Sequence, residues 1–310
     1  MCSRRLLNLT LNRLWGRFWL IVAIIGGAGR MGVWFARYFL EHGHEVIISD
    51  VRVDRAREVA KLMNVKLAES NVEAARKASL ILVSTPIDVT PEVLTEILPE
   101  IDKDAIVVEI SSLKSRVLPT LKRAAERGIR ALSLHPLFGF GAQKLSSEKI
   151  ALVPVVDPIA EKDLAEKIFP EAAIIPVNWN LHERAMALIL ALTHFVNIVF
   201  ASIIGEEDID MLKRLGGTTF TLQFILSEAV MSEEPSLYAS IQMDNKYAAT
   251  YLDKLIKRVM DLKGIIEKKD YDAFINFYVG VRNLLSKDAD FVKAYEKMYN
   301  ALKALRCGDD

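Results

Sequence analysis

The fold is decided by an apolar run that leads into clustered glycines, Ile21-Val22-Ala23-Ile24-Ile25-Gly26-Gly27-Ala28-Gly29-Arg30-Met31-Gly32. The run is typical of a buried strand, and a helical pattern from Val33 to Leu40 follows it. Strand, glycines and helix in this order predict a dinucleotide-binding loop, residues Gly27 to Gly32. We expect Gly27 to permit the tight turn, Gly29 to let the backbone approach a pyrophosphate, and Gly32 to let helix and strand pack closely. The phosphates then face the N-terminus of the helix.

An acidic residue follows the next apolar run. Asp50 stands after Glu45-Val46-Ile47-Ile48, eighteen residues beyond Gly32. A carboxylate at this point hydrogen-bonds both ribose hydroxyls and repels a 2′-phosphate, which predicts NAD as the cofactor. Arg52 and Arg55 lie close by, and a guanidinium there can accept a 2′-phosphate, so NADP stays an alternative.

Two kinds of pattern divide the chain. Up to about residue 178, short β-rich runs alternate with helical patterns, which predicts a mainly parallel sheet covered by helices. The later runs are 80–83, 105–108, 151–156 and 173–175, with a helical segment at 159–168. Beyond it, strand patterns largely vanish and helices are expected at 181–204, 222–231, 236–268, 271–285 and 288–305. The fold class is therefore α/β: an N-terminal extension (1–19), a Rossmann-type NAD-binding domain (20–178) and an all-α substrate and dimerisation domain (179–310).

Residues 181–204 contain no Gly or Pro and are apolar on all sides. A helix of this kind is expected to be buried on most sides, either as the core of its domain or in a subunit interface. We favour a homodimer built through these helices. A monomeric bundle is the alternative.

The composition argues against nucleic acid and membranes as partners. Forty basic residues balance forty acidic ones, so no overall field draws the protein to nucleic acid or to a membrane surface. The two cysteines, Cys2 and Cys307, stand near opposite ends and suggest neither disulfides nor a metal site, which fits a reducing, cytoplasmic compartment. Arginines ahead of residues 18–25 resemble a signal peptide, but cleavage after that run would remove the first strand.

Polar groups follow three of the runs, on the carboxyl edge where ligands of open α/β sheets bind. Ser84-Thr85-Pro86 follows one run and is expected to back the nicotinamide end of the cofactor. Ser111-Ser112-Leu113-Lys114 follows the next. His135 ends the apolar run 131–134 and is followed by Pro136, so it is placed to handle a proton.

Together these stretches resemble the prephenate and arogenate dehydrogenases of tyrosine biosynthesis over roughly residues 20–290. The resemblance is carried by the glycine loop and by Ser112-Leu113-Lys114, His135-Pro136-Leu137-Phe138-Gly139, His182, Leu192-Thr193-His194-Phe195 and 234–241. It implies oxidation of a small anionic substrate, prephenate, by NAD with loss of carbon dioxide.

The resemblance also assigns roles. Hydride leaves the ring carbon that bears the 4-hydroxyl, so a base must take or share that proton, and His135 is the candidate. Ser112 is expected to orient the imidazole or the hydroxyl. His194 matches the second histidine of the family, which lines the substrate pocket. His182 precedes His194 by twelve positions, about 18 Å along one continuous helix, so it is expected at a domain junction or behind the site.

One position departs from the family pattern. Family members usually carry an arginine that binds a substrate carboxylate, and the matching position here is Thr221. A threonine cannot replace a bidentate guanidinium. Either another cation binds the carboxylate, with Lys114, Lys213, Arg214 and Lys246 as candidates, or the affinity and preference for substrate differ from the family pattern.

Three other functions stay open. Arogenate dehydrogenase differs in whether the pocket accepts an ammonium or a ketone on the side chain. A β-hydroxyacid dehydrogenase shares the domain plan but normally uses a catalytic lysine, for which no matching motif is apparent. A dinucleotide-sensing regulator would keep the fold without turnover, since fold alone does not establish chemistry.

Overall fold

The computed structural model describes residues 19–306, so the predicted extension lies outside the described residues except for Trp19. The chain divides into two compact units, and the division falls between Glu183 and Arg184. We call the part up to Glu183 the sheet unit and the part from Arg184 the helical unit. The sequence places this boundary slightly earlier, at residue 178.

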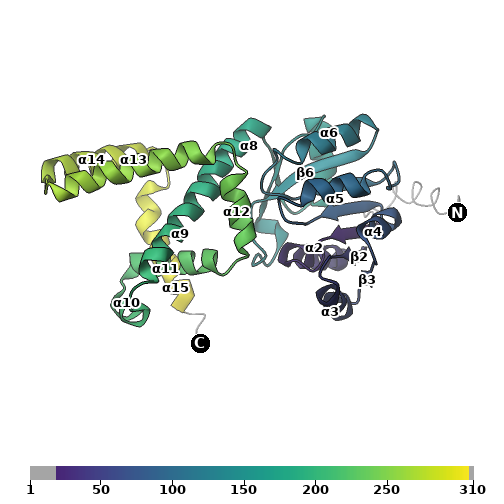
Figure 1. The fold of residues 1–310 in the computed structure, drawn as a ribbon, viewed down its shortest axis with the longest axis horizontal. Helices are drawn as coiled ribbons and strands as arrows, with labels where there is room; N and C mark the ends of the chain where they lie inside the picture. The colour runs from purple at the N-terminus through teal and green to yellow at the C-terminus, as the bar shows by residue number, and fades with distance from the viewer. Residues whose placement is uncertain (1–18, 307–310) are drawn as a thin grey trace. The chain divides into compact units, whose positions relative to one another are not determined.

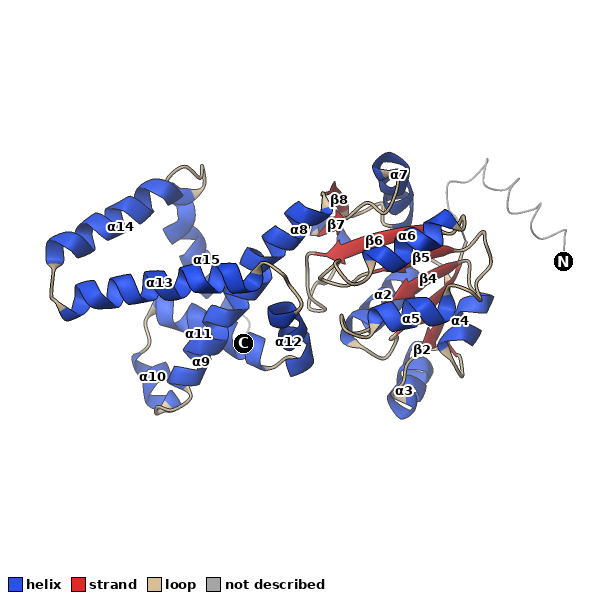
Figure 2. Ribbon diagram, turned by 45° about the horizontal axis from the view of Figure 1, so that its top comes forward, coloured by secondary structure: helices blue, strands red, loops and turns tan. Residues whose placement is uncertain are grey.

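The sheet unit contains one eight-stranded sheet with the order β3-β2-β1-β4-β5-β6-β7-β8 (Figure 2). Neighbouring strands are parallel except for β6 and β7, which are antiparallel. The chain reverses direction across the sheet between β1 and β4, where ligands of open α/β sheets bind. The strands are β1 (Ile21–Ile25), β2 (Glu45–Ser49), β3 (Lys66–Leu67), β4 (Leu80–Val83), β5 (Ile106–Glu109), β6 (Arg130–Pro136), β7 (Lys149–Leu152) and β8 (Ala173–Pro176).

Helices cover both faces of this sheet (Figure 1). One core joins the sheet to α2 (Arg30–Glu41), α3 (Val53–Met63) and α7 (Pro158–Ile168), with Phe35, Phe39 and Phe169 fully buried. The other core joins it to α4 (Asn71–Lys77), α5 (Thr90–Ile97) and α6 (Leu118–Glu126). A short 3-10 helix, η1 (Leu145–Ser147), precedes β7. The central strands are apolar on both faces because each face packs against helices.

The helical unit is all-α, as predicted. It contains most of the long apolar helix and then α10 (Ile209–Leu215), α11 (Thr218–Met231), α12 (Pro235–Met243), α13 (Ala248–Glu267), α14 (Tyr271–Leu285), the 3-10 helix η3 (Phe291–Lys293) and α15 (Ala294–Arg306). The helix predicted at 236–268 is two helices, because the chain turns at residues 244–247. Figures 1 and 2 show α13 and α14 as an antiparallel pair.

The long apolar helix is not α-helical throughout. It consists of α8 (Trp179–Met186), a π-helical segment η2 (Ala187–Leu192) and α9 (Thr193–Ile204). Two side chains bond to carbonyls of the π segment: Gln242 Nε2 donates to Ala191 O at 2.8 Å, and Thr193 Oγ1 donates to Leu188 O at 3.2 Å.

The prediction that this helix is buried on most sides is wrong for the chain by itself. Among the described residues it is the one helix long and apolar enough to cross a membrane, with mean hydropathy 2.3 over 18 residues, of which 17% are buried. Its exposed side chains include Ile189, Val196 and Ile203, which recur every seven residues. Such a stripe is typical of a helix that packs against another helix.

Candidate active site

The glycine loop connects β1 to α2 by close backbone contacts. Gly26 has the positive φ of this turn, 81°, and Gly27 follows it within the same turn. A Cβ on Gly27 would lie 2.6 Å from Ile48 Cβ, and a Cβ on Gly32 would lie 2.2 Å from Gly26 O. Gly29 forms the N-cap of α2. The loop therefore leaves the first N–H groups of α2 exposed for an anion, as a dinucleotide pyrophosphate requires.

Asp50 lies beside this loop at the end of β2. Its Oδ2 accepts from Ala28 N at 3.0 Å and from Arg52 Nη2 at 3.2 Å, and its Oδ1 accepts from Arg52 N and Nε. Burial raises the pKa of Asp50, but the hydrogen bonds from Arg52 and Ala28 outweigh it and lower the pKa. Arg55 Nε donates to Ala28 O at 2.9 Å. Both arginines thus flank the predicted cofactor loop.

The loop after β4 packs directly on the glycine loop. A Cβ on Gly26 would lie 2.4 Å from Ser84 O. Thr85 Oγ1 and Thr90 Oγ1 are 2.9 Å apart, and Ser111 Oγ donates to Thr90 Oγ1 at 3.3 Å. Thr90 therefore ties the predicted cofactor residues Ser84 to Pro86 to the loop that follows β5. The sequence analysis missed this role of Thr90.

The peptide after His135 is attached to α2, the helix that Gly29 caps. The Phe138 ring lies 4.9 Å from the Trp34 ring, and Trp34 Nε1 donates to Ala142 O at 2.6 Å. The Arg30 guanidinium lies 4.6 Å from the centre of the Phe140 ring. These contacts attach the segment after β6 to the helix that follows the predicted cofactor loop.

His135 lies near the end of β6 with 5% of its surface exposed. Its Nδ1 atom is 3.1 Å from His182 Nε2, so one of these nitrogens donates to the other. Burial lowers the pKa of His135 well below its usual value, and the nearby Lys114 ammonium and His182 lower it further. The imidazole is thus neutral at pH 7, the state in which it can accept a proton.

The partner of His135 is therefore His182, which the sequence expects at a junction or behind the site. Ser112, predicted to orient His135, is partly exposed and forms no hydrogen bond to it in the described structure. The neighbouring Ser111 is buried and donates its backbone N–H to Glu109 Oε2 at 2.8 Å. Ser112 thus remains a proposed contact of the substrate.

Lys114 is fully enclosed, unlike a side chain that binds substrate from solvent. Its Nζ donates to Glu109 Oε1 at 2.7 Å and to Leu134 O at 2.6 Å. Ser133 Oγ donates to the same Glu109 oxygen. Burial lowers the pKa of Lys114, and the carboxylates of Glu109 and Glu183 oppose this. The prediction that Lys114 binds a substrate carboxylate is therefore corrected: the ammonium neutralises Glu109 and holds the strand residue before His135.

The helical unit presents His194 at the start of α9. Its ring meets the Tyr238 ring edge-on at 4.9 Å, and burial lowers its pKa. Thr221 lies in the first turns of α11, where its hydroxyl donates to Gly217 O at 3.1 Å. Thr221 is therefore occupied within its own helix and supplies no charge for a carboxylate.

The candidate cations of the helical unit differ in their surroundings. Lys213 Nζ lies 3.3 Å from Glu228 Oε1 and 5.0 Å from the Phe224 ring centre. Arg214 belongs to α10, which follows the far end of α9. Lys246 is exposed in the turn between α12 and α13, and both of these helices pack against the π segment that leads into His194.

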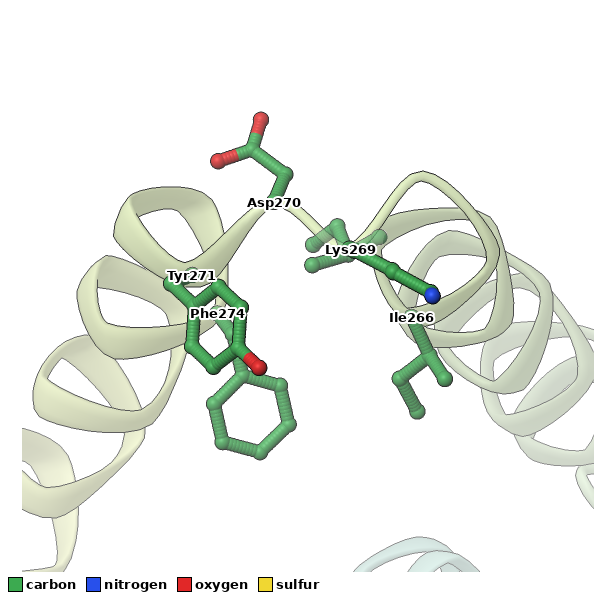
Figure 3. Close-up of a pocket in the computed structure, with 6 residues that line it drawn as sticks. Ile266, Lys269, Asp270, Tyr271 and Phe274 are labelled. Atoms are coloured by element: carbon green, nitrogen blue, oxygen red, sulfur yellow. The ribbon is translucent and has the colours of Figure 1, made fainter.

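A cavity of about 370 Å³ lies in the helical unit, at the turn between α13 and α14. Figure 3 shows Ile266 and Lys269 on one side of this turn and Tyr271 and Phe274 on the other. Asp270 caps α14 by accepting from Ala273 N at 2.9 Å. None of the predicted site residues lines this cavity, so we do not assign the reaction to it.

Two family models match the sequence. Residues 35–153 match "Prephenate dehydrogenase, nucleotide-binding domain", and residues 178–278 match "Prephenate dehydrogenase, dimerization domain". The sequence is 26% identical over 267 residues to a probable arogenate/prephenate dehydrogenase of Methanocaldococcus jannaschii, covering 83% of this chain and 59% of that protein. It is 24% identical over 287 residues to the 4-amino-4-deoxyprephenate dehydrogenase of Streptomyces pristinaespiralis, covering 90% of this chain and 96% of that protein. The chain thus spans only about three fifths of the archaeal relative.

Solved structures share the fold. The prephenate dehydrogenase of A. aeolicus, in complex with hydroxyphenyl propionate and NAD+, has a TM-score of 0.70 at 18% identity, covering 86% of this chain and 98% of that one. The Synechocystis arogenate dehydrogenase has a TM-score of 0.63, also at 18% identity, covering 86% of this chain and 99% of that one. The predicted fold class and NAD-binding domain are confirmed. The chain belongs to the prephenate dehydrogenase family.

Proposed function

We propose that this protein catalyses the NAD-dependent oxidative decarboxylation of prephenate to 4-hydroxyphenylpyruvate. The observation that carries the proposal is His135, a buried neutral imidazole near the end of β6 whose following peptide packs on the helix of the glycine loop. This is the position in which a base meets a substrate bound against a dinucleotide.

Gly27 to Gly32 and Asp50 are the residues that would hold NAD, with Ser84, Thr85 and Pro86 behind its nicotinamide. The fit rests on the close packing at Gly27 and Gly32 and on the Asp50 carboxylate beside the loop. When bound, NAD accepts the hydride of the substrate. Because Arg52 engages both oxygens of Asp50, we infer that Arg52 turns aside as the ribose hydroxyls take its place.

His135 takes the proton of the 4-hydroxyl as the C4–H bond gives up its hydride and the C4 carbonyl forms. The C1–carboxylate bond then breaks, its electron pair enters the ring, carbon dioxide leaves, and the proton returns to the phenolate oxygen. No net proton is released. Ser112 is proposed to orient the hydroxyl, and His194 to line the pocket. The protein chiefly positions the ring and holds one proton, since aromatisation drives the loss of carbon dioxide.

The substrate carboxylate needs a cation that Thr221 does not supply. We propose Lys246, because α12 and α13, on either side of it, both pack on the π segment next to His194. Arg214 comes after the end of α9, so the ten residues from His194 to Ile204 alone span about 15 Å. Lys213 belongs to the same helix, α10.

Arogenate is the close alternative substrate, and 4-amino-4-deoxyprephenate is the substrate named for one relative. Purified protein with NAD should be offered each of the three compounds while NADH absorbance is followed. We expect prephenate to give the highest kcat/KM. A higher value with arogenate would reassign the substrate, and NAD binding without turnover of any compound would favour a dinucleotide-sensing regulator.

We further propose that the protein is a cytoplasmic homodimer formed through the helical unit. The support is the exposed stripe Ile189, Val196 and Ile203, together with the match to a dimerization domain. Sedimentation analysis should give twice the mass of one chain. Val196→Lys should produce monomers, whereas Leu62→Lys, on the exposed face of α3, should not. A monomeric wild-type protein would contradict the proposal.

A further inference from the structure

We propose that Glu183, acting through His182, fixes which nitrogen of His135 carries the proton and leaves Nε2 of His135 as the proton acceptor. The inference rests on the proposed function, in which His135 is the base. Glu183 and His182 are positioning residues in this account, since neither is assigned a contact with the substrate. The three side chains lie in the sheet unit.

The geometry forms a chain of three buried groups. Glu183 is fully buried and His182 is 1% exposed. His182 Nε2 and His135 Nδ1 share a hydrogen bond of 3.1 Å, whereas Glu183 Oε1 lies 3.5 Å from His182 Nδ1, an electrostatic contact without a hydrogen bond. The two imidazole planes are inclined by 75°, with ring centres 5.3 Å apart.

Charge decides how the protons lie along this chain. A proton on His182 Nδ1 faces the Glu183 carboxylate, whereas a lone pair on that nitrogen would face a negative oxygen among buried groups, which is unfavourable. With this proton on Nδ1, the nitrogen of His182 that accepts from His135 is Nε2. His135 must therefore donate from Nδ1, and its own lone pair is left on Nε2.

The carboxylate is held in place from the β5 side. Lys114 donates its backbone N–H to Glu183 Oε1 at 2.8 Å, and its ammonium donates to Leu134 O, one residue before His135. Lys114 therefore links Glu183, the first of the three buried groups, to β6, the strand that holds His135. Glu109 pairs with the same ammonium, so both carboxylates, Glu109 and Glu183, contact Lys114.

The arrangement supports both proton transfers, the uptake of the hydroxyl proton by His135 and its return to the phenolate. When Nε2 takes the hydroxyl proton, His135 becomes an imidazolium whose Nδ1–H still points at His182. The negative charge of Glu183 stabilises that cation through the intervening ring, and the same proton leaves Nε2 when the phenolate forms. An orienting carboxylate behind a catalytic histidine acts in this way in serine proteases.

The test begins with ligand-free protein carrying ¹⁵N-labelled histidine, because two-bond ¹H–¹⁵N spectra distinguish a protonated ring nitrogen from one with a lone pair. At pH 7.5 we expect protons on Nδ1 of both His135 and His182. In Glu183→Gln, we expect both rings to populate the opposite tautomer as well. With prephenate, kcat of this variant should fall by about 10- to 100-fold at nearly unchanged NAD affinity.

Glu171→Gln is the matched control, because Glu171 Oε1 lies 3.2 Å from His42 Nε2 at the surface of the same unit. It should keep wild-type kcat and leave the His135 spectrum unchanged. A proton on His135 Nε2 in the wild-type protein would overturn the inference, and so would a Glu183→Gln spectrum identical to wild type. The spectra need no turnover, so a failure of the proposed function would be recognised separately, by absence of NADH formation in the wild-type protein.

Discussion

The ammonium of Lys114 lies 2.7 Å from the carboxylate of Glu109, and neither side chain reaches the solvent. Two charges can share such a site only as a pair, because an isolated buried ion loses its hydration without compensation. Glu109 ends β5, and its register partner in β6 is Ser133, two residues before His135. The family motif Ser112-Leu113-Lys114 is thereby given a structural task in this chain.

Removing one charge of this pair should destabilise the protein strongly. For Lys114→Met we expect the free energy of unfolding to fall by about 3 to 5 kcal/mol, because Glu109 would remain as a buried unpaired carboxylate. Urea unfolding followed by circular dichroism measures the change. The double variant Glu109→Gln/Lys114→Met should be more stable than the single one, and Lys162→Met, from a surface pair with Glu166, should change little. A loss below about 1 kcal/mol for Lys114→Met would contradict the pairing.

The pH dependence of turnover should show a base with a lowered pKa. Only neutral His135 accepts a proton, and its burial together with Lys114 and His182 places its pKa well below the usual 6.5. Activity is therefore kept as the pH falls through 6.5 and is lost only when the folded-state pKa is reached. The acid limb of kcat/KM against pH reports this group in the free enzyme. A midpoint at or above 6.5 would show a histidine of ordinary or raised pKa.

Asp50 should control the choice between NAD and NADP. In Asp50→Asn the ribose hydroxyls lose a charged acceptor, and Arg52 is released from its ion pair to meet a 2′-phosphate. We expect NAD binding to weaken by about tenfold, the loss of one charge-assisted hydrogen bond, and NADP binding to strengthen. Fluorescence titration with each cofactor measures both. Asp54→Asn, which removes an exposed partner of Arg57, is the control, and an unchanged NAD-to-NADP ratio in Asp50→Asn would refute the assignment.

Lys246 should affect substrate affinity and leave cofactor affinity unchanged. For Lys246→Gln we expect KM for prephenate to rise by about 10- to 100-fold, which corresponds to one charge-assisted bond to a carboxylate. Initial rates at saturating NAD give this value. Arg214→Gln serves as the comparison and should leave KM close to that of the wild type. If Arg214→Gln raised KM and Lys246→Gln did not, the two assignments would have to be exchanged.

The sequence predicts those parts of the fold that local patterns encode. The run from Ile21 to Gly32 dictates strand, turn and helix within twelve residues, and His135 is placed near a strand end by the apolar residues before it. The surroundings of Lys114 depend on residues distant in the chain, such as Leu134 and Glu183, which no periodicity brings together. The π segment is not predictable from local sequence either, because one of its hydrogen bonds comes from Gln242, 51 positions after the acceptor Ala191. The exposed stripe on the long helix is also not predictable, because its composition does not say which of its faces other helices of the chain cover.

His135 is the central claim of this account, and one comparison tests it most directly. Wild-type protein and His135→Asn should each be mixed with NAD and prephenate, with NADH absorbance recorded and NAD binding titrated separately. We expect NADH from the wild-type protein, a rate lower by about 10²- to 10⁴-fold in the variant, and similar NAD affinity in both. A variant that turned prephenate over at the wild-type rate, or that lost NAD binding and turnover together, would show that His135 is not the base.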